Sequence, residues 1–479
     1  MDPKTDKVTI WEKSAYGMGD LASNLFYQTF TMFLLYYYTD VFGISAAAAG
    51  TMFLVVRLLD TFYDPIVGIL ADRTNSKYGK FRPWILYTVI PFGVLGVLTF
   101  ITPDLVTSSK LVYAYVTYTA MMFVYSTINV PYGALMAVMT SNSLERTSLS
   151  AFRSISAFLG GIIVQAFTLK LVHYFGLIKA NADGSANEQF GFSAAMGIYS
   201  VLAVILFLTT FLMCKERVKP ILDKKSSLKK DLKDLFTNVP WMILTLVGIM
   251  TCLYVAIRNG SIIYYFKYYI NNTGTADLFG FQIGAGALVS TFMIVGTVCS
   301  ILGTVLLKPM AALIGKKRVY MVSMTLGSVL SVAYYFLDKN QITAMFTFQA
   351  LCNFAVGPAM AMMWSMYADT TDFSELKTGR RATGLIFSSA NFAQKLGWSI
   401  GGAIAGYLLA WFGFVANTPV TAQTENGVRV LFALMPAIWS AIAVVALFFY
   451  QLDEKKVIEI NLKLADLKAS KLGYVPIQK

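Results

Sequence analysis

Runs of apolar residues recur along this chain at the spacing of one membrane crossing and its loop. A helix needs about 20 mostly apolar residues to cross the hydrocarbon core of a bilayer. The centres of runs this long lie near residues 27, 60, 92, 124, 162, 203, 253, 298, 327, 355, 398 and 440. The pattern therefore predicts an all-α membrane protein with about twelve transmembrane helices.

The loops between the apolar runs alternate between a basic set and a set poor in lysine and arginine. The basic residues, apart from those of the two chain ends, are Arg73, Lys77, Lys80 and Arg82; Arg146; Lys215 to Lys233; Lys316, Lys317 and Arg318; and Lys377, Arg380 and Arg381. Loops rich in lysine and arginine stay on the cytoplasmic side of a membrane. We therefore expect a multi-pass protein of the bacterial inner membrane with both termini in the cytoplasm.

Short motifs recur at an offset of about 235 residues, which is close to half of the chain. Tyr78–Arg82 is matched by Ile314–Arg318, and Arg146 by Arg380. Such an offset indicates a duplicated six-helix unit. The predicted parts are an N-terminal bundle with the cation site (1–214), a cytoplasmic middle loop with an amphipathic helix (215–238), a C-terminal bundle (239–450) and a cytoplasmic tail (451–479).

Two apolar stripes with helical spacing lie outside the predicted spans. They are Leu228, Leu232, Leu235 and Phe236 in the middle loop, and Val457, Ile460, Leu464 and Leu467 in the tail. Stripes of this kind predict surface helices, and we expect both helices to pack on the ends of the bundles. The aromatic run Tyr36-Tyr37-Tyr38 is expected to belong to an interfacial belt.

The composition supports a membrane protein and excludes several other classes. Of 479 residues, 56% are apolar and 14% are charged. The net charge of +13 comes without any nucleic-acid recognition motif. The absence of a G-x-x-x-x-G-K-[ST] loop argues against an ATP-driven pump. No nucleophile–base pair or CxxC is visible, so we expect neither an enzyme nor an organic cofactor.

Two aspartates inside one apolar span are the strongest chemical signal. Asp60 and Asp64 lie four residues apart between Gly50 and Leu70, and Arg57 lies one turn before Asp60 on the same face. A carboxylate in hydrocarbon needs a partner, a proton or water beside it. This stripe therefore predicts a site for a monovalent coupling cation, Na⁺ or H⁺.

Hydroxyl groups in the fourth span are candidates to complete that cation site. Ser126 and Thr127 lie in this span, and small hard cations prefer oxygen ligands. The alternative is that these hydroxyls bond to their own backbone one turn back.

Other polar residues in the spans are candidate substrate ligands. Arg153 opens the fifth span, where it either snorkels to the interface or reaches into a cavity. Lys395 lies deep in the eleventh span, where a buried ammonium can pair with a carboxylate and couple cation to substrate. Further candidates are Asn24 and Tyr27 in the first span, Asn129 in the fourth, and Trp364 in the tenth, which either stacks on a sugar ring or packs.

Six longer motifs resemble those of one transporter family and occur in its order. They are YGMGD at Tyr16–Asp20, YYYTDVFG at Tyr36–Gly43, RLLDTFYDP at Arg57–Pro65, DRTNSKYGKFRPW at Asp72–Trp84, INVPYGAL at Ile128–Leu135 and ADTTDFSELKTGRRATGLIFS at Ala368–Ser388. The chain thus resembles the glycoside–pentoside–hexuronide:cation symporters of the major facilitator superfamily, which include the melibiose permease and the glucuronide carriers. The resemblance implies a sugar symporter that uses Na⁺, Li⁺ or H⁺ by alternating access of two six-helix halves.

The resemblance also implies roles for particular residues. The cation-binding positions of the melibiose permease hold Asp60, Asp64 and Ser126 here, and its sugar-binding positions on helices five and eleven hold Arg153, Asn391 and Lys395. Its two sugar-binding carboxylates are replaced by Asn24 and Asn129. An asparagine before the second aspartate is replaced by Tyr63, and a tryptophan by Gly133.

The exchange of two acids for amides, with Arg153 and Lys395 retained, makes the sugar site more positive. This favours an acidic ligand such as a hexuronide, whereas neutral xylosides stay open because amides also bond hydroxyls. The rival functions are a lysolipid:Na⁺ symporter and a non-transporting receptor or scaffold. The expected partners are a small sugar or glycoside, a monovalent cation and the lipid bilayer, with no nucleic acid, and the chain is expected to be a monomer.

Overall fold

The fold is described from a computed structural model of residues 8–140, 143–217, 235–270, 275–278, 281–378 and 383–471. These residues divide between two compact units. The first unit is formed by Met1–Leu222, Asn259–Ile294 and Gly402–Val428, and the second by Asp223–Arg258, Val295–Gly401 and Arg429–Lys479. The boundaries of the four parts predicted from the sequence stay a prediction.

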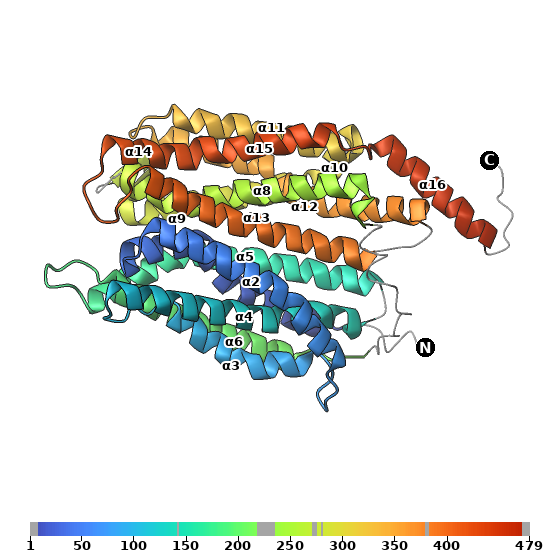
Figure 1. Cartoon of the computed structure of the whole chain (residues 1–479), viewed down its shortest axis with the longest axis horizontal. Coiled ribbons are helices and arrows are strands. Elements are labelled where there is room, and N and C mark those ends of the chain that lie inside the picture. Colours follow the sequence, from blue (N-terminus) through green and yellow to red (C-terminus); the bar gives the residue numbers. More distant parts are fainter. Residues whose placement is uncertain are drawn as a thin grey trace. The chain divides into compact units, whose positions relative to one another are not determined.

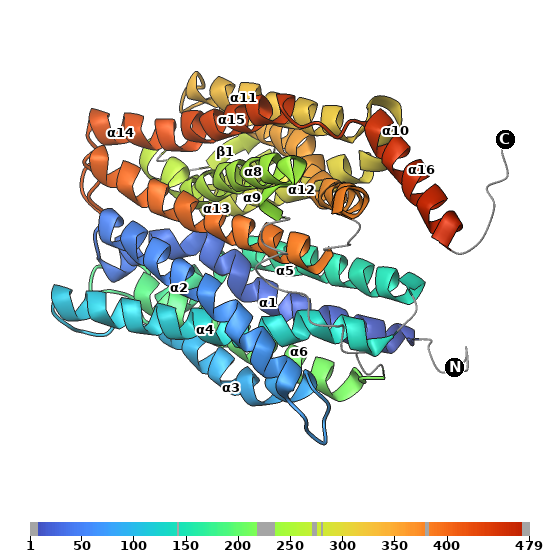
Figure 2. The same cartoon turned by 45° about the vertical axis from the view of Figure 1, so that its right-hand side comes forward.

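Almost all of the described chain is helical (Figure 1). Up to the middle loop the helices are α1 (Ile10–Tyr36) with its continuation η1 (Tyr37–Phe42), α2 (Ala46–Arg73), α3 (Arg82–Leu98), α4 (Thr107–Met139), α5 (Ser143–Ile178) and α6 (Glu188–Met213). In the first unit α3 packs against α4 and α6, and α1 packs against α5 and α6 (Figures 1 and 2).

A second series of helices follows the middle loop. It consists of α8 (Val239–Tyr264) with η2 (Tyr265–Ile270), α9 (Ala285–Val305), α10 (Leu307–Ile314), α11 (Lys316–Tyr335), α12 (Ile342–Thr378), α13 (Thr383–Trp411), α14 (Ala422–Arg429), η3 (Val430–Leu434), α15 (Met435–Phe448) and α16 (Glu454–Lys471). A short antiparallel hairpin of β1 (Thr275–Leu278) and β2 (Phe281–Gly284) pairs Thr275 with Gly284. This hairpin is not predicted by the helical pattern of the sequence.

All twelve predicted span centres fall inside helices. Seven helical segments in the described residues are long and apolar enough to cross a membrane: Ser108–Met136, Ser148–Ile178, Glu188–Met213, Val239–Ile270, Gly286–Val305, Ile342–Thr378 and Ala422–Phe448. The other five centres lie in α1, α2, α3, α11 and α13. The prediction of an all-α membrane protein is thereby confirmed.

Glycines of α1 and α5 let these two helices of the first unit pack closely. A Cβ atom placed on Gly17 would lie 2.5 Å from Ser156 Oγ and 3.0 Å from a backbone oxygen of α5. A Cβ atom on Gly160 would lie 2.9 Å from the Cβ of Asn24. Small residues at such crossings let two helix backbones approach closely. The glycine-rich start of α1 therefore sets the positions of the polar residues one and two turns later.

Both α1 and α8 end in a π-helical segment, η1 and η2. The two segments lie about one repeat offset apart in the sequence, in agreement with a duplicated helical unit. Tyr36, Tyr37 and Tyr38 are all buried, with exposures of 4%, 0% and 0%. Their prediction as an interfacial belt is wrong, because these rings pack against aromatic neighbours such as Phe192.

The second unit has a core that extends onto the tail helix α16. Val457, Ile460 and Leu464 are buried against the ends of the unit's other helices, as the apolar stripe predicts. In Figure 2, α16 leaves the end of α15 at an angle. In the middle loop Leu235 is buried and Phe236 is exposed, whereas Leu228 and Leu232 lie outside the described residues, as does the side chain of Leu467.

The α1–α5 crossing yields a direct test of the packing. Gly17→Ala is expected to lower stability by about 1–3 kcal/mol, because the added methyl group meets backbone atoms that cannot rotate away. Gly197→Ala is the matched control, since a Cβ atom there meets nothing within 4 Å. Thermal unfolding of the purified protein in detergent measures both. Equal melting temperatures for the two variants would contradict the close packing.

Candidate functional site

Asp60 of α2 and Ser126 of α4 form a buried pair in the first unit. Their exposed fractions are 0% and 1%. The Ser126 hydroxyl donates a hydrogen bond of 2.5 Å to Asp60 Oδ1. The neighbouring Thr127 instead donates to the carbonyl of Phe123 in its own helix. Of the two candidate hydroxyls, the serine is therefore the one that meets the carboxylate.

Arg57 lies one turn before Asp60, as the sequence spacing requires. Its guanidinium is hydrogen-bonded to the hydroxyl of Tyr118 of α4, and it interacts electrostatically with Asp60 and Tyr27. Tyr118 is buried, with 2% exposure. A positive charge close to Asp60 lowers the cost of a carboxylate in an apolar region, so Arg57 and Ser126 stabilise the same carboxylate in two ways.

The second aspartate of the stripe, Asp64, is half-buried. The preceding Tyr63 turns toward α4, where its hydroxyl lies 3.1 Å from Thr127 Oγ1 and its ring stacks on Phe123 with centroids 4.5 Å apart. The position that holds an asparagine in the melibiose permease is thus occupied here by a side chain that packs between helices. This leaves Asp60, Asp64 and Ser126 as the candidate oxygen ligands.

Arg153 of α5 forms an ion pair with Asp20 of α1. The distance from Arg153 Nε to Asp20 Oδ1 is 2.9 Å. The guanidinium also lies over the ring of Tyr132, 5.5 Å from its centroid. The partner of Asp20 is thus a residue of α5 that lies 133 positions away in the sequence.

The two asparagines that replace sugar-binding acids are both half-buried and hydrogen-bonded. Asn24 donates its amide to the Asp20 carbonyl at 2.9 Å and to Asp20 Oδ2 at 3.2 Å. Asn129 accepts a 2.6 Å hydrogen bond from Ser23 and donates to the Tyr125 carbonyl. Asn24, Asn129 and Arg153 thus belong to one polar region on α1, α4 and α5, and Tyr27 of α1 is half-buried near Arg57.

Three predicted site residues belong to the second unit. Trp364 of α12 packs beside Tyr367 with centroids 6.1 Å apart, and it lies against the hydrophobic core. Asn391 is exposed and Lys395 is half-buried, both on α13. Their predicted roles in sugar binding and coupling stay predictions.

A further charged residue of the second unit, Arg258 of α8, was missed by the sequence analysis. It is 4% exposed and donates a 2.9 Å hydrogen bond to Gln349 Oε1. Its guanidinium lies between the rings of Tyr334 and Phe432, 4.8 and 4.7 Å from their centroids. An arginine within the apolar run of α8 is a visible signal, and cation–π contacts stabilise its burial.

A second ion-pair network of the first unit was also missed. The side chain of Asp40 in η1 is fully shielded from solvent, and Lys267 Nζ of η2 lies 2.9 Å from its Oδ1. Tyr268 donates its hydroxyl to the same oxygen. Asn417, whose φ is +57°, donates to the Asp40 carbonyl at 2.6 Å. We call Asp40, Lys267, Tyr268 and Asn417 the Asp40 network.

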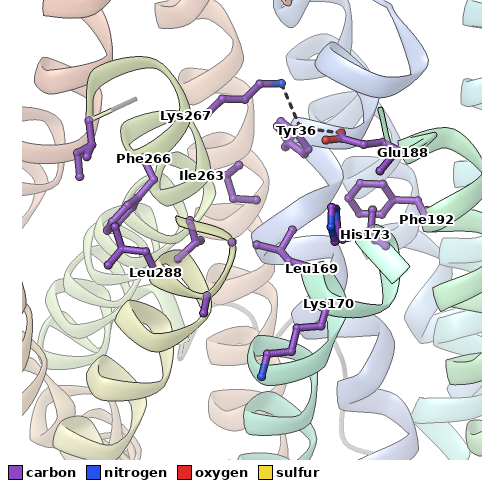
Figure 3. A pocket seen from close by; sticks show the side chains of 16 residues that line it. Tyr36, Leu169, Lys170, His173, Glu188, Phe192, Ile263, Phe266, Lys267 and Leu288 are labelled. Carbon is purple, nitrogen blue, oxygen red and sulfur yellow. Dashed lines mark hydrogen bonds between the residues drawn. The ribbon is translucent and has the colours of Figure 1, made fainter. Parts of the chain in front are cut away.

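Lys267 of the Asp40 network lines a cavity of about 480 Å³ in the first unit (Figure 3). Lys267 donates to the Tyr36 hydroxyl at 3.1 Å, and that hydroxyl donates to Glu188 at 2.7 Å. His173 and Lys170 of α5 line the same cavity (Figure 3). In the sequence, Asp40 and Lys267 each stand out as a charge near the end of an apolar run. Nothing in the sequence indicates that these two charges meet.

The chain was compared with families and proteins of known description. A model of the family described as MFS/sugar transport protein matches residues 15–454. The chain belongs to this family. Its activity is therefore transport rather than catalysis of a chemical reaction, and the family resemblance predicted from the motifs is confirmed.

Curated relatives extend over nearly the whole chain. The symporter YnaJ of Bacillus subtilis is 35% identical over 94% of this chain and 93% of its own. The inner membrane symporter YicJ of Escherichia coli is 34% identical over 97% of each chain. The isoprimeverose transporter of Lactiplantibacillus pentosus is 34% identical over 92% of this chain and 89% of its own.

Solved structures of other transporters share the fold. The nucleoside transporter NupG superposes with a TM-score of 0.61 at 14% identity, over 92% of this chain and 100% of its own. A bacterial homologue of the lysosomal transporter Spinster, inward-facing and unoccupied, gives 0.66 at 12% identity, over 92% and 95%. At these identities the likeness shows the fold alone, which is that of the major facilitator superfamily, as predicted.

The Asp40 network predicts a specific loss of stability. Lys267→Met removes the ammonium beside a carboxylate that water does not reach, and a drop of about 1–3 kcal/mol is expected because Lys267 is itself partly exposed. Lys170→Met is the matched control, since this exposed lysine lines the same cavity. Thermal unfolding in detergent measures both. A Lys267→Met protein as stable as the control would contradict the network.

Proposed function

We propose that this chain takes up a sugar or glycoside together with a monovalent cation, Na⁺ or H⁺, that is held at Asp60. The observation that carries the proposal is a fully buried carboxylate in α2 whose oxygen accepts a hydrogen bond from Ser126 of α4. A buried carboxylate in a membrane helix is energetically costly. It is suited to ion transport because a cation or a proton can periodically neutralise its charge. Relatives described as glycoside/cation and inner membrane symporters support the same activity.

The proposed cation site uses oxygen ligands from two helices. Asp60 and Asp64 supply negative charge from α2, and Ser126 supplies a hydroxyl from α4. A proton would reside on Asp60 itself, whereas Na⁺ would take oxygens of all three residues. Either ion lowers the repulsion between the two carboxylates of α2, and Na⁺ would also attract the Ser126 hydroxyl of α4.

The proposed sugar ligands in the first unit are Asn24, Asn129, Arg153 and Tyr27. Amide and guanidinium groups suit sugar hydroxyls because they offer several donors and, for the amides, an acceptor. The names of relatives span the isoprimeverose transporter and a glucuronide carrier protein homolog. Half-buried polar side chains of this kind disfavour a lysolipid as the cargo, since its acyl chain would meet amides.

Coupling between cation and sugar is proposed to be reciprocal. Cation binding at Asp60 favours the state that binds sugar, and sugar binding then raises cation affinity by the same factor. Lys395 of α13 is proposed as a third coupling residue because its charge lies deep within an apolar helix.

We also propose the orientation that the basic loops indicate. Both termini and the middle loop would face the cytoplasm in a bacterial inner membrane, and the N-terminal bundle would hold the cation site. The Asp40 network would then face the outside, because it lies at the opposite end of α1 from the N-terminus.

The proposal predicts that Asp60→Asn separates accumulation from exchange. The variant is expected to lose uphill uptake at least tenfold because its amide binds neither a proton nor a cation as a carboxylate does, while equilibrium exchange of sugar persists. Proteoliposomes loaded with a panel of glycosides, at varied Na⁺ and pH, measure both. The same panel identifies the coupling cation.

Asp104→Asn is the matched control for this experiment, since it removes an exposed carboxylate from the loop before α4. It is expected to accumulate sugar like the unaltered protein. Uphill uptake that survives in Asp60→Asn at the level of Asp104→Asn would refute the cation site. Absence of uptake of every glycoside by the unaltered protein would refute sugar transport.

A further inference from the structure

Arg153 is the positively charged member of the polar region that contains the two candidate sugar-binding asparagines, and its charge is already paired. The distance from Arg153 Nε to Asp20 Oδ1 is 2.9 Å. The side chain of Asp20 is 10% exposed, whereas that of Arg153 is 40% exposed. The carboxylate is thus the buried partner, and the guanidinium is the one that a ligand can reach.

Asp20 also holds Asn24, which lies one turn later on α1. The Asn24 amide donates to Asp20 Oδ2 at 3.2 Å, so both carboxylate oxygens have donors. Tyr132 supports the guanidinium from another side, and its own hydroxyl donates to the Tyr16 carbonyl at 2.6 Å. Asp20 therefore fixes two candidate sugar ligands, and the ring beneath Arg153 is fixed as well.

The charges in this part of the site add up to zero. Asp20 contributes one negative charge and Arg153 one positive charge, while Asn24, Asn129 and Ser23 are neutral. The sequence-based argument for an acidic ligand counted the charges of Arg153 and Lys395, and the ion pair compensates that of Arg153. A ligand carboxylate near Arg153 would compete with Asp20 for the guanidinium, and the negative charge of Asp20 would repel it.

We propose that Asp20 is the residue that sets the charge selectivity of the sugar site. By pairing with Arg153, it makes this surface suit an uncharged glycoside and reject a hexuronide. Asp20 acts as a positioning residue, through Arg153 and Asn24, rather than as a ligand of the sugar. This inference rests on the proposed sugar transport and adds the ligand's charge to it.

The test compares two ligands that differ by one carboxylate group. Phenyl β-xyloside and phenyl β-glucuronide share the same ring and aglycone, and the glucuronide adds a carboxylate at C5. The unaltered protein is expected to transport the xyloside in preference. In Asp20→Asn the guanidinium loses its carboxylate partner, and the ratio of glucuronide to xyloside transport is expected to rise roughly tenfold or more.

Further variants separate selectivity from a general structural effect. Asp20→Glu keeps the charge and is expected to keep the original ratio. The double variant Asp20→Asn with Arg153→Gln is expected to lose the gain in glucuronide transport, because that gain needs the guanidinium. Asp20→Ser removes the same charge with a smaller side chain and provides the measurement if the asparagine variant does not reach the membrane. Asp104→Asn again controls for removal of a remote carboxylate.

The outcomes distinguish this inference from the proposed function. An unaltered protein that transports the xyloside, with the same ligand ratio in Asp20→Asn and Asp20→Ser, would overturn the role of Asp20 alone. An unaltered protein that prefers the glucuronide would also overturn it, although sugar transport would stand. If the unaltered protein transports no glycoside of the panel, the proposed function fails and this inference fails with it.

Discussion

The structure of the first unit depends on how carboxylates are kept inside a layer that excludes water. A carboxylate without compensation costs several kcal/mol in such a place, of the order of 3–5 kcal/mol when one partner of a buried pair is removed. Asp20 is compensated by a guanidinium and Asp40 by an ammonium and a phenol. Asp60 is fully buried on α2, where its oxygen accepts a hydrogen bond from Ser126 and Arg57 acts on it electrostatically. The proposed exchange of a mobile cation concerns this third carboxylate.

Helix α1 links the polar region to the Asp40 network. Asp20 and Asn24 lie near its middle, and Asp40 lies in its π-helical continuation η1. Twenty residues separate the two aspartates, which corresponds to about 30 Å along a helix. The glycine contacts with α5 fix the first half of α1, and the contacts with Lys267 and Tyr268 fix its far end. A shift of α1 would therefore change both regions together.

The sequence predicts much of this arrangement because its signals are local. Helical spans follow from apolar runs of membrane length, and the candidate cation site follows from Asp60 and Asp64 inside one such run. Pairing between distant segments is not local. Asp20 and Arg153 are 133 residues apart in the chain, and Asp40 and Lys267 are 227 apart. Each of the four stands out as a charge in or beside an apolar run, but the sequence does not say which charges meet. The same limit applied to Ser126 and Thr127, because only the rotation of α4 decides which hydroxyl faces Asp60.

The central claim is that the charge of Asp60 is neutralised by a cation that moves with the sugar. Electrical recording from proteoliposomes on a solid-supported membrane measures the charge displaced when a transported glycoside is added, whichever cation carries it. The account predicts a current in the unaltered protein and its loss in Asp60→Asn, with glycoside binding still detectable in the variant. A current of equal size in both proteins would contradict the account.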